Sequence, residues 1–167
     1  MSKSRIDVYR NQYMMANNWL EDTIDGLTPA QVNFQPGGKA HSVGANYCHH
    51  IQALDAIILG MLKGGQPLKA SAFAGQCGST EPAPFGDWDE WARTTTVDLD
   101  RARTYAQAVY AAVDEYFAGL TDDRLDEIVD LSFLGMGEQP RWFMLNLLLI
   151  DTALHTGEIS AIRVFRV

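Results

Sequence analysis

Four long stretches of the chain repeat their apolar residues with the period of an α-helix, and this pattern constrains the fold more than any other feature. Almost nothing in the sequence alternates with the two-residue period of a half-buried strand. We expect helices over residues 4–26, 42–63, 87–118 and 140–163. Helices of roughly 20 residues are about 30 Å long, a suitable size for an antiparallel bundle. The sequence therefore predicts an all-α four-helix bundle.

Capping and stop signals agree with these helices. Gly26 ends the first helix and Gly64 follows the second as stop signals, and Ser42 is a good N-cap for the second. Pro140 fits the first turn of the fourth, where its missing N–H costs nothing. The helix boundaries are thus supported by residues other than the apolar ones.

The remaining segments are short turns and one long loop. Residues 66–85 carry three of the six prolines and form the loop between the second and third helices, long enough for a non-adjacent arrangement. Short extra helical turns are expected at Thr28 and at Thr121, and 129–136 is a candidate extended segment. The residues after the loop cannot form a core alone, so we expect residues 1–167 to be a single domain.

Composition excludes several classes of partner. Of the 167 residues, 47% are hydrophobic, which is enough to build a core, and the formal net charge is −8 with no dense Lys/Arg cluster. A nucleic-acid partner or an anionic membrane surface would need a basic footprint, so neither is expected. The N-terminus has no apolar signal segment. Cys48 and Cys77 have no metal-binding spacing and are expected to be buried thiols, which favours the reducing cytoplasm.

His50 lies on the apolar face of the predicted second helix. At 100° per residue it falls in the middle of the apolar stripe, whereas His49 lies about a quarter-turn away and is expected to have no special role. The stripe consists of Val43, Tyr47, Leu54, Ile57 and Met61. An imidazole that faces a bundle interior needs a hydrogen-bond partner, a metal ion or water.

Asp151 and His155 lie on the predicted inward face of the fourth helix. They are four residues apart, so they occupy one face, one turn apart. A carboxylate on a core face is costly unless it is paired or bound to a metal ion. With His50 they form a candidate site for one divalent metal ion. The same pattern also fits an Asp151–His155 pair that buffers His50 without a metal, and the residues alone do not decide.

Four other residues are candidates for supporting or structural roles. Asn46, one turn before the first histidine, either supports the site or lies partly exposed. Glu158 either orients His155, acts as a base, or is exposed at the surface. Trp19 and Trp142 are expected to pack in the core.

Four different short motifs follow one another along nearly the whole chain. They are Asn17–Leu20 with Gly26–Gln31, His41–Ala45 leading to His50 and Ile51, Leu120–Asp123, and His155–Ile159 leading to Arg163. In order and spacing these motifs resemble those of the DinB-like superfamily, also called DinB/YfiT-like metalloenzymes. The resemblance implies a DinB/YfiT-like four-helix bundle.

The resemblance also implies a ligand set. The family has one metal-binding histidine on the second helix and a His-x-x-x-His pair on the fourth, which places the ligands at His50, Asp151 and His155. Asp151 stands where the family has histidine, and Thr156 and Glu158 replace the Arg and Gln of the closing motif. Two histidines and a carboxylate still leave open coordination positions, and the added charge favours harder ions. The alternative is a degenerate site that binds poorly.

The family further implies a function. Its characterised members include metal-dependent transferases and isomerases that use a low-molecular-weight thiol, so we expect a thiol-dependent S-transferase or isomerase with nickel, zinc, iron or manganese. A metal-assisted hydrolase would use the same site. The alternatives are a non-catalytic stress-response bundle that binds a metal or small ligand, and a purely structural domain. A small-molecule substrate and a homodimer are also implied.

Overall fold

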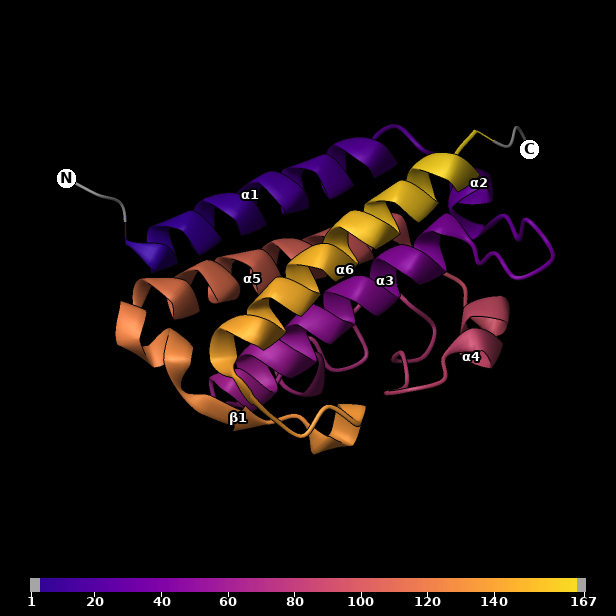
Figure 1. Cartoon of the computed structure of the whole chain (residues 1–167). Helices are drawn as coiled ribbons and strands as arrows, with labels where there is room; N and C mark the ends of the chain where they lie inside the picture. Colours follow the sequence, from indigo (N-terminus) through magenta and orange to yellow (C-terminus); the bar gives the residue numbers. More distant parts are fainter. Residues whose placement is uncertain (1–3, 165–167) are drawn as a thin grey trace.

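Four long helices pack side by side in the computed structural model, which describes residues 4–164 (Figure 1). They are α1 (Arg5–Ile24), α3 (Val43–Leu54) with its continuation η1 (Asp55–Leu62), α5 (Leu99–Ala118) and α6 (Arg141–Ile162). Helix α1 contacts α5 and α6, and α3 contacts the same two helices. The predicted all-α bundle is confirmed.

Neighbouring helices do not simply alternate in direction. In Figure 1, α1 and α6 run the same way, and α3 and α5 both run the opposite way. Two contacts agree with this arrangement. Arg163 donates to the carbonyl of Thr23 at 2.7 Å, which joins the ends of α6 and α1. The N–H of Arg5 donates to Asp122 at 2.9 Å, which joins the start of α1 to the end of α5. The long connection over residues 63–98 allows α3 and α5 to be parallel.

The buried face of α1 leaves out one residue that was predicted for the core. Tyr13, Leu20 and Ile24 are buried, and the Tyr13 hydroxyl donates to the Leu145 carbonyl at 2.7 Å. The prediction that Trp19 packs in the core is wrong, because its side chain is 63% exposed. The residues that face the core recur from Tyr13 at three- and four-residue steps, and Trp19 lies about 100° from its neighbour Leu20 around the helix. In contrast, Trp142 is partly buried and packs against the core.

Helix α3 continues into a wider π-helix, η1, which places a buried carboxylate under the following loop. Asp55 is fully buried and accepts three hydrogen bonds of 2.7 Å, from the N–H groups of Leu68 and Lys69 and from the hydroxyl of Tyr105. Ionised carboxylates are buried only when they are well paired. Asp55 therefore ties the short helix η2 (Leu68–Ala70) to the bundle.

The predicted third helix, residues 87–118, is wrong as one continuous element. It consists of the short α4 (Asp89–Thr94) and α5, separated by an extended stretch. Within this stretch Val97 forms an isolated antiparallel bridge with Ser79, and its backbone exchanges two hydrogen bonds with the Asn33 side chain. The run Thr94-Thr95-Thr96-Val97 is β-branched, which favours extended backbone over helix.

The remaining elements are short. They are α2 (Pro29–Asn33), η3 (Asp122–Asp126), β1 (Ile128–Asp130), η4 (Ser132–Leu134) and β2 (Glu138–Pro140). Strands β1 and β2 pair antiparallel, with Val129 opposite Gln139. The expected extended segment over 129–136 is thus correct only at its start, because η4 comes next. None of the helices in the described part of the chain combines the length and apolar character that crossing a membrane would require.

Candidate metal centre

Helix α3 places His50 in the interior. The helix begins with Ser42, whose hydroxyl accepts the N–H of Ala45 at 3.1 Å. His50 is fully buried, as its position in the apolar stripe predicts. Its Nδ1 lies 3.0 Å from Oδ2 of Asp151 on the neighbouring helix α6.

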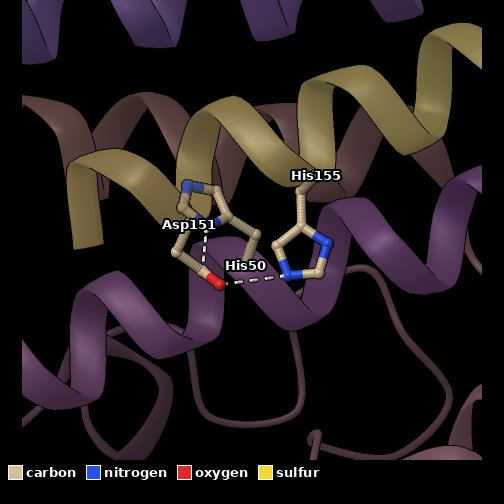
Figure 2. A group of neighbouring side chains, drawn as sticks. All are labelled: His50, Asp151 and His155. Carbon is tan, nitrogen blue, oxygen red and sulfur yellow. Dashed lines mark hydrogen bonds and ion pairs between the residues drawn. The ribbon is translucent and has the colours of Figure 1, made fainter. Parts of the chain in front are cut away.

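Helix α6 presents Asp151 and His155 to the same point. His155 is almost completely buried, and its Nε2 lies 3.6 Å from Oδ1 of Asp151. Figure 2 shows the carboxylate of Asp151 between the two imidazole rings, with all three side chains in the interface of α3 and α6. The Asp151 side chain remains 35% exposed, so this group is open to solvent on one side. The structure therefore brings together the three residues predicted as ligands.

The spacing of these atoms fits a metal ion. One ligand atom from each of His50, Asp151 and His155 lies within 4.8 Å of the other two. With ligand distances of about 2.1 Å, adjacent ligands are about 3.4 Å apart in a tetrahedral site and about 3.0 Å in an octahedral one. The His50 Nδ1–Asp151 Oδ2 separation of 3.0 Å and the His155 Nε2–Asp151 Oδ1 separation of 3.6 Å lie close to these values, and each involves a different oxygen of the carboxylate.

Two buried imidazole nitrogens here lack a hydrogen-bond partner within residues 4–164: Nε2 of His50 and Nδ1 of the adjacent His49. Nε2 of His50 is inaccessible and has no hydrogen bond within the described chain. Leaving a buried polar atom unsatisfied costs about 1–3 kcal/mol. Nε2 of His50 is the ring nitrogen that does not contact Asp151, so only a water or an ion on that side of the ring would compensate for its burial.

The charge states suit a cation. Burial lowers the pKa of His50, and the hydrogen bond and negative charge of Asp151 only partly oppose this effect. Burial alone would raise the pKa of Asp151, but the hydrogen bond from His50 and the nearby imidazoles lower it overall. At neutral pH the site therefore offers an uncharged His50 and an ionised Asp151, the forms that bind metals.

Glu158 supports His155 from the outer side. Its Oε2 lies 3.0 Å from Nδ1 of His155, one turn along α6. A carboxylate on the second nitrogen fixes the orientation of a metal-binding imidazole and raises its basicity. Of the expected roles of Glu158, orienting His155 is the one that this contact supports.

The positions of two neighbours differ from the sequence prediction. His49, expected to be ordinary, lies at the site: its ring stacks on Trp88 with centroids 4.0 Å apart and meets the His155 ring edge-on at 5.5 Å. Burial, followed by the effect of His155, lowers the pKa of His49 to about 4. Asn46 is buried and not partly exposed, and its side-chain amide donates to the Ser42 carbonyl. Adjacency to His50 was the available signal for His49, whereas Trp88 was placed in the predicted third helix and lies just before α4 in the structure.

A pocket of about 300 Å³ opens beside Asp151 and His49. Its walls come from α3, α6 and three loops. Most of the lining is apolar and includes Ala53, Ile57, Pro84, Phe85, Leu134, Met144, Leu147 and Leu148. A small molecule in this pocket would contact the exposed side of Asp151.

A family model described as the DinB superfamily matches residues 14–159. The chain belongs to the DinB superfamily. The match spans both α3 and α6, so it includes all three candidate ligands. The resemblance drawn from the short motifs is thereby confirmed.

A solved structure supports the fold of this DinB-superfamily chain. A conserved protein from Enterococcus faecalis has a similar structure with a TM-score of 0.82 at 20% sequence identity, covering 97% of this chain and 96% of that one. At this identity the similarity shows the fold alone. No protein with a curated description matches the sequence.

Proposed function

We propose that this protein is an enzyme that binds one divalent metal ion with His50, Asp151 and His155. The observation that carries the proposal is the convergence of these three side chains, with one ligand atom of each residue within 4.8 Å of the other two. Membership of the DinB superfamily supports the same assignment. Two imidazoles and one carboxylate suit zinc, nickel, iron or manganese.

Within this proposal, thiol-dependent S-transfer or isomerisation is the preferred reaction. When bound, an ion with open coordination positions would lower the pKa of a thiol and favour its thiolate. The chain's own thiols are poorly suited, because burial raises the pKa of both Cys48 and Cys77. The nucleophile would therefore come from a small-molecule thiol.

The protein residues would position and shield the reaction. Glu158 holds the His155 ring, and the stacked rings of His49 and Trp88 form a wall beside it. Asp151 is the ligand with the most exposed side chain of the three, and it also lines the pocket. A substrate would approach from this side, where the apolar lining excludes water from much of its surface.

We also propose that the protein is a cytoplasmic homodimer. Met15 and Trp19 are 50% and 63% exposed and border a groove between α1 and α6 whose floor includes Ala153 and Gly157. Large side chains beside a groove of small residues suit a twofold contact between identical surfaces. Replacing Trp19 with Glu should give a monomer in sedimentation experiments, and an unchanged sedimentation coefficient would exclude this face. The two free, buried cysteines are compatible with a reducing compartment.

Cobalt spectroscopy tests the metal-dependent function. Metal-free protein titrated with Co²⁺ should develop visible d–d absorption, and subsequent 2-mercaptoethanol should add a near-ultraviolet thiolate-to-cobalt band. His155→Ala should abolish both signals, while His41→Ala, a histidine paired with Asp89 instead, should retain them. Cobalt absorption without the thiolate band would favour a hydrolase or a non-catalytic binding protein. No cobalt absorption at all would refute the proposal.

A further inference from the structure

The pocket beside Asp151 contains a lysine whose ammonium group has no hydrogen-bond or ion-pair partner in the part of the chain that the structure describes. Lys69 lines this pocket, and its side chain is partly buried. Within residues 4–164 its ammonium group forms neither a hydrogen bond nor an ion pair. Burial lowers the pKa of Lys69, and the charges of Asp55 and Cys77 oppose this effect. A partly desolvated, unpaired ammonium group is a favourable site for an anion.

The backbone of Lys69 is held in place, so its position is built into the fold. Its N–H and that of Leu68 donate to the buried carboxylate of Asp55, each at 2.7 Å. Both Asp55 oxygens are thus occupied, and one also accepts the Tyr105 hydroxyl. The carboxylate fixes the turn that carries the lysine while leaving the ammonium group available.

Apolar side chains line the pocket that Lys69 and Asp151 both border. They include Leu147 and Met144 on α6, Phe85 in the long connection and Leu134 at the end of η4. Phe85 also meets the ring of Phe133 at 5.6 Å, which joins the long connection to η4. An apolar cavity of about 150 Å³ holds one benzene ring, so the 300 Å³ here suits a body of about two rings.

Taken together, the charge and the lining define the ligand. We propose that the substrate is a small carboxylic acid with an apolar, ring-sized body, whose carboxylate pairs with Lys69 and whose reactive end lies at Asp151. This inference deepens the proposed function, because the role of Asp151 rests on it. The pairing with Lys69 does not depend on a metal and is tested separately.

Binding of two matched probes tests the proposal. 2-Naphthoate and 2-naphthalenemethanol share an aromatic body and differ in charge, and their binding is measured by tryptophan quenching and by calorimetry. The wild type should bind the acid about tenfold more tightly than the alcohol, the lower end of the range for hydrogen bonds to charged groups. Lys69→Met should remove this preference, and Lys69→Arg should retain most of it. Leu147→Gln should weaken both probes alike.

Two controls make the outcomes decisive. Lys63→Met removes a lysine that pairs with Glu115 instead, and it should leave the preference unchanged. The preference should also persist in His155→Ala, so loss of the metal site and failure of the carboxylate pocket are distinguishable. Equal binding of both probes by the wild type, no measurable binding of either, or a preference that survives Lys69→Met with an unchanged melting temperature would overturn the proposal.

Discussion

Replacing Asp55 with Ala should destabilise the fold severely. The change leaves the hydroxyl of Tyr105, a residue that is only 1% exposed, without its acceptor, at a cost of about 1–3 kcal/mol. The N–H groups of Leu68 and Lys69 lose partners as well, but they are nearer to solvent and should cost about 1 kcal/mol each. We therefore expect a loss of about 3–5 kcal/mol in the free energy of unfolding.

Urea denaturation at pH 7 measures this loss. Asp55→Asn, which keeps the volume and one acceptor oxygen, should fall between wild type and Asp55→Ala. Asp22→Ala, at an exposed position on α1, should stay within about 0.5 kcal/mol of wild type. If Asp55→Ala costs less than about 1 kcal/mol, the buried carboxylate does not anchor η2, and it does not fix the position of Lys69 either.

Two titratable groups and two glycines give the remaining predictions. The depressed pKa of His49, about 4 against 6.5, means that metal-free protein loses stability as pH falls from about 6.5 to 4, by a contribution on the order of 3 kcal/mol. His49→Phe should reduce that loss in denaturation curves at pH 7 and 4.5, and an identical loss would contradict the assignment. The pKa of Lys69 lies below the usual 10.5, so its ammonium group should lose its proton at a lower pH than that of an ordinary lysine. The preference for 2-naphthoate over 2-naphthalenemethanol should decline over that same lower pH range, which calorimetry from pH 7 to 10.5 tests. Gly78 has a φ of 88° and a Cβ there would lie 2.5 Å from the nitrogen of Ala102, so Gly78→Ala should cost more than about 2 kcal/mol in urea denaturation. Gly157→Ala, on α6 with open space around it, should be neutral or stabilising.

The candidate ligands could be predicted because they lie on regular helices. His50, Asp151 and His155 face inward at positions that the 3.6-residue period places directly, and the family motifs support the same set. The same periodicity misplaced Trp19, because hydrophobic character alone does not show which apolar residues on α1 lie outside the buried face. Nearest-neighbour contacts between helices decide that question.

The walls of the pocket could not be predicted in the same way. Lys69 and Phe85 lie in the long connection after η1, where the sequence has no period to extrapolate, and Trp88 lies just before α4, in the segment wrongly predicted as one continuous helix. Their positions depend on tertiary contacts, such as the Asp55 carboxylate beneath η2. The break before α5 depends on a bridge to Ser79 from the same connection, and no local signal in the chain specifies that partner.

Metal content is the most direct test of the metal centre. Elemental analysis should be made on untagged wild type, His155→Ala and His41→Ala, each purified and then incubated with zinc, nickel, iron or manganese. We expect close to one ion per chain in the wild type and in His41→Ala, and its loss in His155→Ala. A wild type that stays metal-free after every incubation would contradict the proposed metal centre, and would show that His50, Asp151 and His155 form only a hydrogen-bonded group.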